Sequence, residues 1–227
     1  MAKDDTGRLH VTVKTGGKRK LSSKLWLERQ LNDPYVAQAK RDGYRSRAAY
    51  KLKEMDDKYK LLKSGQAVID LGAAPGGWSQ IAARKVGSVE GRGKVVAIDL
   101  LEMPEIPGVD FAQLDFMAEE APARLREMLG GGADVVMSDM APNTTGHRKT
   151  DQLRILGIVE SAAAFALEVL NPGGTFLAKV FQSGADASLL AELKRDFAVI
   201  RHVKPAASRQ DSSERYLLAT GFRGRAE

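Results

Sequence analysis

The sequence predicts an α/β protein built on a mostly parallel sheet of seven strands, with helices on both faces and a basic helical segment before it. Two observations lead to this prediction. From residue 66 onward, short apolar runs alternate with helical patterns, which is typical of parallel strand–helix–strand units. Before that point the chain is helical in pattern and rich in Lys and Arg.

The predicted strands are short runs of mostly apolar residues, and several of them end at Asp or Gly. Runs of this length are consistent with strands that are buried on both faces of a sheet. The strands are expected over residues 67–71, 94–99, 109–113, 133–139, 175–181, 198–203 and 215–220.

The predicted helices have apolar residues at helical spacing. In the body of the chain they cover residues 79–86, 121–129, 151–170 and 187–197. The third of these ends at Asn171-Pro172-Gly173-Gly174, which is a strong stop signal. Before the sheet, a helical pattern starts at Ser22, and two more helices are expected over 35–43 and 46–60, with Ser46 as the N-cap of the second.

Composition excludes several classes of protein. The chain has 227 residues, of which 43% are hydrophobic and 28% charged, as in ordinary globular proteins and unlike disordered chains, collagens or coiled coils. No apolar run approaches the roughly 20 residues that a membrane span needs. Without Cys, there is no disulfide scaffold, thiol nucleophile or Cys-ligated zinc. The three His residues are far apart, so no metal is expected. The N-terminus is polar and lacks a signal sequence, which predicts a cytoplasmic protein.

The charge is unevenly distributed along the chain. Residues 1–63 hold 17 Lys and Arg against 8 Asp and Glu, whereas residues 64–227 hold 18 against 21. Clustered positive charge attracts polyanions such as nucleic acids through counterion release. The alternative is a solvated charged face that keeps the protein soluble. Arg45 and Arg47, which lie beside Tyr44, are the side chains best suited to phosphate contact and base stacking.

These patterns divide the chain into four parts. Residues 1–21 form a basic tail that we expect to be disordered, because it has almost no apolar periodicity. Residues 22–63 form a basic helical segment for RNA binding, packed on the main domain. Residues 64–222 form the α/β domain, and 223–227 form a short tail.

A glycine-rich loop follows the first predicted strand, within Asp70-Leu71-Gly72-Ala73-Ala74-Pro75-Gly76-Gly77-Trp78-Ser79. The glycine spacing is not that of the dinucleotide fingerprint, and the Lys-Ser/Thr pair of a P-loop is missing. The loop therefore suits a nucleoside ligand without a phosphate tail. Asp99, at the end of the second strand, is placed to accept hydrogen bonds from ribose hydroxyls, and Asp115 is placed to meet an adenine edge. The alternative for both is a turn carboxylate, and Trp78 is equally well explained as a core residue or a ligand wall.

Lys179 stands inside the apolar run 176–181, where a lysine is costly unless it is paired or functional. The alternative is a lysine that extends its ammonium group to solvent. Asp139 follows the fourth strand, at the sheet edge where such folds bind ligands. Lys51 and Glu214, taken alone, carry little information.

Together these motifs resemble the FtsJ family, over roughly residues 22–222. The segments that carry the resemblance are 45–52, 70–79, 137–143, 179–182 and 213–221. The chain departs from compact members in its longer basic tail, residues 1–21, and locally at 183–186. The resemblance implies a Rossmann-like fold that transfers a methyl group from S-adenosylmethionine to a ribose 2′-hydroxyl. The nearest members imply a uridine in the A-loop of 23S rRNA within the large (50S) subunit, modified by a monomeric enzyme.

The resemblance also assigns roles to individual residues. It implies a catalytic tetrad of Lys51, Asp139, Lys179 and Glu214. It implies cofactor contacts at Gly76, Trp78, Asp99, Asp115 and Asp139. A ribose hydroxyl is a weak nucleophile, and Lys179 is expected to orient it and stabilise its developing charge. Because Asp139 and Glu214 favour the charged lysine, a role as general base is conditional.

Three alternatives remain open at this point. A 2′-O-methyltransferase of transfer RNA or of a messenger cap has the same tetrad. A ribosome assembly factor that only binds RNA has the same basic segment. A nicotinamide-dependent oxidoreductase shares the fold class, although the glycine spacing disfavours it.

Overall fold

The computed structural model describes residues 11–13, 21–142, 147–181 and 187–224. Most of the tail predicted to be disordered, Asn143 and the local departure at 183–186 lie outside these residues. Within the tail, the backbone N–H of Val11 donates to Asn32 Oδ1 at 2.8 Å, and that of Val13 donates to Glu28 Oε1 at 3.1 Å.

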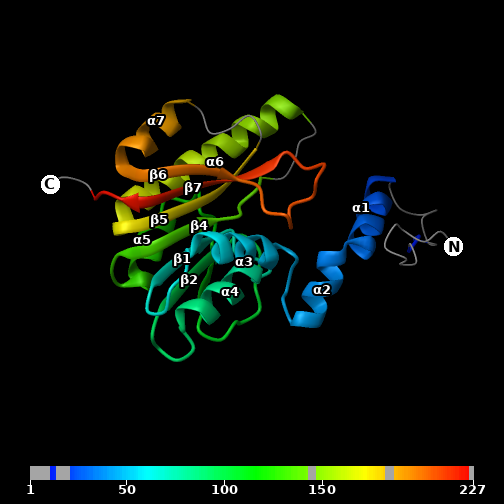
Figure 1. Ribbon diagram of the computed structural model, residues 1–227, viewed down its shortest axis with the longest axis horizontal. Coiled ribbons are helices and arrows are strands. Elements are labelled where there is room, and N and C mark those ends of the chain that lie inside the picture. Colours follow the sequence, from blue (N-terminus) through cyan, green and yellow to red (C-terminus); the bar gives the residue numbers. More distant parts are fainter. Residues whose placement is uncertain (1–10, 14–20, 143–146, 182–186, 225–227) are drawn as a thin grey trace.

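The seven predicted strands form one sheet in the order β3-β2-β1-β4-β5-β7-β6 (Figure 1). The first five are parallel neighbours, and β7 pairs antiparallel with both β5 and β6. The predicted mostly parallel sheet is therefore confirmed. The strands are β1 (Ala67–Leu71), β2 (Lys94–Asp99), β3 (Asp110–Gln113), β4 (Ala133–Ser138), β5 (Leu170–Phe181), β6 (Phe197–Val203) and β7 (Glu214–Phe222).

Helices cover both faces of the sheet, as predicted (Figure 1). They are α1 (Leu21–Asn32), α2 (Pro34–Asp42), α3 (Ala48–Tyr59), α4 (Gly77–Val86), α5 (Ala121–Leu129), α6 (Arg148–Val169) and α7 (Ala187–Asp196). Helices α3 and α4 pack with Val68 and its neighbours on one face, whereas α5, α6 and α7 pack with Ile69 and its neighbours on the other. Successive side chains of a strand point to opposite faces, so the uniformly apolar strands fill two cores at once.

Two local predictions are corrected. The expected N-cap, Ser46, does not cap a helix: α3 begins at Ala48, and the Ser46 hydroxyl is buried without a hydrogen-bond partner. The stop signal at 171–174 does end the helix, since α6 ends at Val169, but β5 begins at Leu170 and not at the predicted 175, and residues 171–174 leave the strand register. Leu170 pairs with Ala133, and the next pairing joins Thr175 to Val135. Gly173 adopts φ 85°, which favours glycine and lets the backbone turn there.

The order of the strands determines where a ligand can bind. Strands β1 and β4 are neighbours in the middle of the sheet, and the chain proceeds outward from them in opposite directions. Crevices at the carboxyl ends of strands beside such a reversal are the usual ligand sites of α/β sheets. None of the helices in the described part of the chain is long and apolar enough to span a membrane.

Candidate active site

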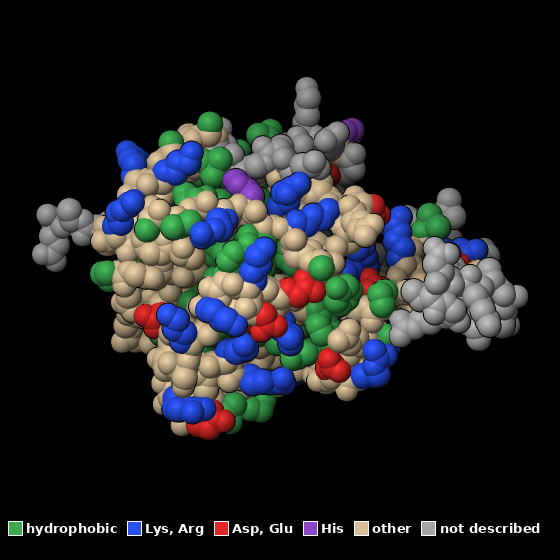
Figure 2. Space-filling model, viewed as in Figure 1, with side chains coloured by type: hydrophobic (Ala, Val, Ile, Leu, Met, Phe, Trp, Pro, Cys, Tyr) green, Lys and Arg blue, Asp and Glu red, His purple; other side chains and the backbone are tan. Residues whose placement is uncertain are grey.

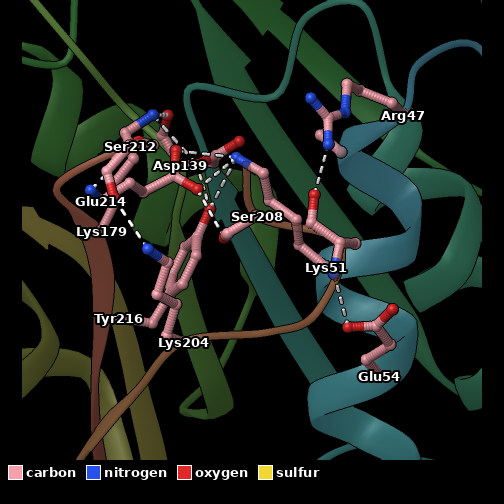
Figure 3. Close-up of polar contacts among 12 residues, drawn as sticks. Arg47, Lys51, Glu54, Asp139, Lys179, Lys204, Ser208, Ser212, Glu214 and Tyr216 are labelled. Carbon is pink, nitrogen blue, oxygen red and sulfur yellow. Dashed lines mark hydrogen bonds and ion pairs between the residues drawn. The ribbon is translucent and has the colours of Figure 1, made fainter. Parts of the chain in front are cut away.

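The four residues of the predicted tetrad come together at the carboxyl edge of the sheet (Figure 3). Lys51 extends from α3, Asp139 follows β4, Lys179 lies on β5 and Glu214 begins β7. They form two ion pairs: Lys179 Nζ lies 3.0 Å from Asp139 Oδ1, and Lys51 Nζ lies 2.7 Å from Glu214 Oε1. Four positions that are distant in sequence thus share one site.

Tyr216 joins the two ion pairs and was not predicted as a site residue. Its hydroxyl donates to Asp139 Oδ1 at 2.8 Å and accepts from Lys51 Nζ at 3.2 Å (Figure 3). Tyr216 is directly opposite Lys179 in the β5–β7 pairing, so both side chains leave the sheet on the same face. A tyrosine within an apolar run is the only feature of the sequence that could have indicated this role. The sequence alone does not give the strand register that places Tyr216 beside Lys179.

The charges of this network stabilise one another. Burial by itself would raise the pKa of Asp139, but the ammonium groups of Lys179 and Lys51, helped by the Tyr216 hydroxyl, outweigh it and lower that pKa. Burial, with the nearby charges of Asp139 and Glu214, raises the pKa of Tyr216 well above its usual range. Asp139 is therefore ionised and Tyr216 protonated near neutral pH, which fixes the direction of the hydrogen bond between them.

Lys179 is held by two acceptors of the same residue. Besides the pair with the Asp139 carboxylate, its ammonium group donates to the backbone carbonyl of Asp139. The Lys179 side chain is 10% exposed, so the ammonium group reaches solvent only through the site. An ammonium group has three protons, and one remains for a further acceptor. The predicted alternative, a lysine extended into solvent, is wrong.

The glycine loop forms a tight cradle beside this network. At Gly72, with φ 77°, an added Cβ would lie 2.5 Å from Met140 Cγ. At Gly76, with φ 109°, it would lie 2.4 Å from Ile106 Cδ1. Only glycine fits these two positions, because the loop packs directly against Met140 at Gly72 and against Ile106 at Gly76. This cradle lies at the carboxyl ends of β1, β2 and β4, where the predicted nucleoside would bind.

Asp99 and Asp115 both make the turn contacts of the structural alternative. Asp99 Oδ2 accepts from the Ala74 N–H at 2.9 Å, and Oδ1 accepts from the Leu101 N–H at 2.8 Å. Asp115 is exposed, and its Oδ1 accepts from the Met117 N–H at 2.9 Å. Each carboxylate oxygen has a second lone pair, so these bonds leave acceptor capacity toward the cradle.

The Trp78 side chain is a core residue. It is 3% exposed, packs against Tyr216 with ring centroids 5.6 Å apart, and donates from its indole N–H to the Ala48 carbonyl at 2.8 Å. Its donor is therefore already used. A contribution of Trp78 to ligand binding is limited to its backbone at the start of α4.

The guanidinium groups of Arg45 and Arg47 bind other groups of the chain itself. Arg47 pairs with Asp33 Oδ2 at 2.7 Å and donates to the Ala207 carbonyl, and its side chain is 15% exposed. Arg45 donates to backbone carbonyls, among them those of Pro104 at 2.6 Å and Glu105 at 2.7 Å. Both groups thus make contacts inside the chain, in place of the free surface position expected of phosphate-binding side chains.

Asp70 is a fully buried carboxyl group in β1, underneath the glycine loop. Its Oδ2 accepts from the Ser79 hydroxyl at 2.6 Å, whereas Oδ1 has no hydrogen-bond partner. Burial, reinforced by the negative charges of Asp139 and Asp99, raises the pKa of Asp70 from 3.8 to about 7, against the Ser79 hydrogen bond. No group of three or more His, Asp or Glu in the described ranges could hold a metal ion.

The raised pKa of Asp70 predicts a pH-dependent stability. Between pH 4 and 7 the folded chain keeps a proton that the unfolded chain loses, so the free energy of unfolding falls as pH rises through this range. Asp70→Asn keeps the shape and removes the charge. We expect a flatter pH dependence, and at pH 8 a gain approaching an upper bound of roughly 4 kcal/mol.

Urea unfolding at pH 5, 6, 7 and 8 measures this effect. Asp110→Asn, the same substitution at an exposed position on β3, is the matched control and should leave the wild-type slope unchanged. An Asp70→Asn slope equal to that of the wild type would contradict the assignment.

Comparison with known proteins identifies the family. The profile of the FtsJ-like methyltransferases matches residues 44–222, which is most of the chain. The chain belongs to the FtsJ-like methyltransferase family. The resemblance seen in the motifs is confirmed, and the chain is a methyltransferase.

Close relatives within the FtsJ-like family cover the whole chain. A ribosomal RNA large subunit methyltransferase E from Afipia carboxidovorans is 84% identical over 99% of this chain and 100% of its own length. The protein of that name from Bradyrhizobium diazoefficiens is 82% identical over 100% of both chains.

Solved structures agree with this assignment. A crystal structure named as a ribosomal RNA methyltransferase from Plasmodium falciparum has a TM-score of 0.70 and 31% identity, over 80% of this chain and 100% of its own. The fibrillarin/Nop5p complex has a TM-score of 0.52 at 19% identity, over 76% of this chain and 81% of its own, and supports the fold alone.

Proposed function

We propose that the chain transfers a methyl group from S-adenosylmethionine to a ribose 2′-hydroxyl of large-subunit ribosomal RNA. The observation that carries the proposal is the network of Lys179, Asp139, Tyr216, Lys51 and Glu214 beside the glycine cradle. Paired cations at the end of a nucleoside site suit a reaction in which a hydroxyl oxygen gains negative charge.

The cradle fits the cofactor by the shape and chemistry of its residues. The loop directly follows β1 at the carboxyl edge of the sheet, and it lacks the Lys-Ser/Thr pair that phosphates need. Asp99 has free lone pairs for ribose hydroxyls, and Asp115 for an adenine edge. When bound, S-adenosylmethionine supplies a methyl group on a positively charged sulfur, which is already a good electrophile.

The residues of the network handle the other reactant. The remaining N–H of the Lys179 ammonium group donates to the 2′-oxygen, which orients this oxygen and stabilises the negative charge that develops on it, and the hydroxyl proton is released to solvent. Asp139 accepts two hydrogen bonds from the Lys179 ammonium group and so holds it in place, which favours a role in orientation and charge stabilisation over proton abstraction. Lys51 pairs with Glu214 and donates to the Tyr216 hydroxyl, and both charged residues line the groove beside the network.

An open groove leads to this network and suits an RNA strand. It has a volume of about 460 Å³ and is lined by residues of α1, α3 and the segment before β7, including Arg29, Lys51, Arg209 and Glu214. Lys and Arg side chains are also spread over the face that carries α3 and α4 (Figure 2). Of the arginines that line the groove, Arg47 and Arg209 both pair with Asp33, at 2.7 Å and 3.3 Å, so the exposed Arg29 is the one that we propose to face phosphates.

The exposed Arg29 provides a test of the groove. We expect Arg29→Ala to weaken RNA binding several-fold and to reduce the slope of log affinity against log salt by about one phosphate contact. Affinity for S-adenosylhomocysteine should not change. Arg124→Ala, at an exposed position on α5, is the control and should leave both quantities unchanged. An unchanged salt slope for Arg29→Ala would exclude Arg29 as a phosphate contact.

The relatives' name points to a substrate in the large ribosomal subunit. We propose a uridine of the 23S rRNA A-loop as the target, in the assembled subunit. Methyl incorporation should be measured with unmodified large subunits, free 23S rRNA and transfer RNA, with Lys179→Ala as the inactive control. Label in subunits that is lost in the variant supports the proposal. Label only in transfer RNA changes the substrate, and cofactor binding without any transfer favours an assembly role.

A further inference from the structure

We propose that Arg45 is a positioning residue for the cofactor pocket, and that it does not act as a contact to RNA phosphate. Its guanidinium group ties together two segments that form one wall of the glycine cradle. This inference rests on the proposed function, because the ligand of that cradle is taken to be S-adenosylmethionine.

The guanidinium group of Arg45 bridges three backbone carbonyls. One terminal nitrogen donates to the Pro104 carbonyl at 2.6 Å and to the Pro75 carbonyl at 3.4 Å, and the other donates to the Glu105 carbonyl at 2.7 Å. Pro75 belongs to the glycine loop, whereas Pro104 and Glu105 belong to the segment that follows Asp99. A planar group with several fixed donors can join two such segments, which a lysine ammonium cannot do with the same geometry.

The segment after Asp99 covers the glycine loop from outside. Met103 and Ile106 are each 5% exposed and pack with Ala73. A Cβ at Gly76 would lie 2.4 Å from Ile106 Cδ1, 2.9 Å from Met103 Sδ and 3.3 Å from Arg45 Cδ. The Arg45 stem and the two apolar side chains therefore close over the same glycine, and the guanidinium group holds that cover in place.

The backbone of Arg45 is fixed to the cofactor side of the molecule as well. Gln80 on α4 accepts from the Arg45 N–H at 2.9 Å through Oε1, and donates to the Gly43 carbonyl at 3.0 Å through Nε2. Helix α4 begins at Gly77, directly after the cradle. Main chain and side chain of Arg45 are thus attached independently to the elements that form the pocket.

Two variants separate positioning from phosphate binding. Arg45→Ala should raise the dissociation constant for S-adenosylhomocysteine, measured by titration calorimetry, by about tenfold or more. Arg45→Lys keeps the charge and loses the planar bridge, so it should restore little of that affinity. In both variants KM for S-adenosylmethionine should rise while kcat at saturating cofactor stays near the wild-type value. Arg41→Ala, on the exposed end of α2, is the control and should change none of these quantities.

RNA affinity, unlike affinity for the cofactor product, should not change in the Arg45 variants. We expect both Arg45 variants to keep the wild-type RNA affinity and salt slope. A reduced salt slope with unchanged affinity for S-adenosylhomocysteine would overturn the inference, and rescue of RNA affinity by Arg45→Lys would reinforce that outcome.

Hydrogen exchange of the ligand-free chain tests the bridge separately from the cofactor. The hydrogen-bonded amides of Ala74, Gly76 and Leu101, which lie in the two bridged segments, should lose protection in Arg45→Ala, and wild-type protection in that variant would overturn the inference. A wild-type chain that fails to bind S-adenosylhomocysteine would refute the proposed cofactor, and with it the role of Arg45 in the pocket, even if the exchange data confirm the bridge.

Discussion

Lys179→Ala is expected to lower the single-turnover rate of methyl transfer by about 10³-fold or more while the fold is retained. The variant removes the group that donates to the 2′-oxygen, and no other described cation takes its place: Lys51 is held by Glu214 and Tyr216. Rapid-quench measurement with labelled S-adenosylmethionine and large subunits gives the rate directly.

Two measurements make this result specific. Thermal unfolding and affinity for S-adenosylhomocysteine show whether the variant is folded. Lys179→Met keeps the length of the side chain if alanine leaves too large a gap beside Asp139. Lys204→Ala, which removes an exposed lysine bonded to the Gln210 and Ser212 carbonyls, is the matched control. Near-wild-type single-turnover activity in a folded Lys179 variant would refute the site.

Asp139→Asn is expected to reduce the single-turnover rate by about 10²-fold or more at every pH between 6 and 9. The substitution keeps the shape of the side chain and removes the negative charge of the carboxylate, which pairs with Lys179 and accepts a hydrogen bond from Tyr216. Breaking a buried ion pair from one side also destabilises the fold, by about 3 kcal/mol or more. Unfolding measurements with and without S-adenosylhomocysteine separate that loss from the loss of rate.

The pH profile of Asp139→Asn distinguishes two roles of Lys179. If Lys179 acted mainly as a general base, the loss of rate in the variant would differ from one pH to another. A role in orientation and charge stabilisation predicts a uniform loss, because the charged lysine is then the active form.

Parts of the candidate site could be predicted where the signal was a chemical conflict in the sequence. Lys179 in an apolar strand required a partner, and Asp139 provides it at 3.0 Å. The glycine loop required a close ligand or a close neighbour, and Gly72 and Gly76 have no room for a Cβ. Such conflicts arise between a residue and its neighbours in the chain, so they can be recognised from the sequence alone.

The sequence did not reveal contacts whose partners carry no sequence signal. Arg45 binds backbone carbonyls and Arg47 binds Asp33 and another carbonyl, so neither is the free cation that its basic surroundings predicted. Ser46 matches the N-cap preference, yet packing of its hydroxyl against Gly77 prevails over capping of α3.

The sequence by itself determined the strands and helices, the cradle and the strand-end carboxylates, because residue periodicity and glycine act within a few positions of the chain. The tertiary structure alone decided that Lys51 meets Glu214 across 163 positions and that Tyr216 joins the two ion pairs. Those contacts depend on strand register and on the packing of α3 against the sheet, which set distances to a few tenths of an ångström that no local pattern encodes.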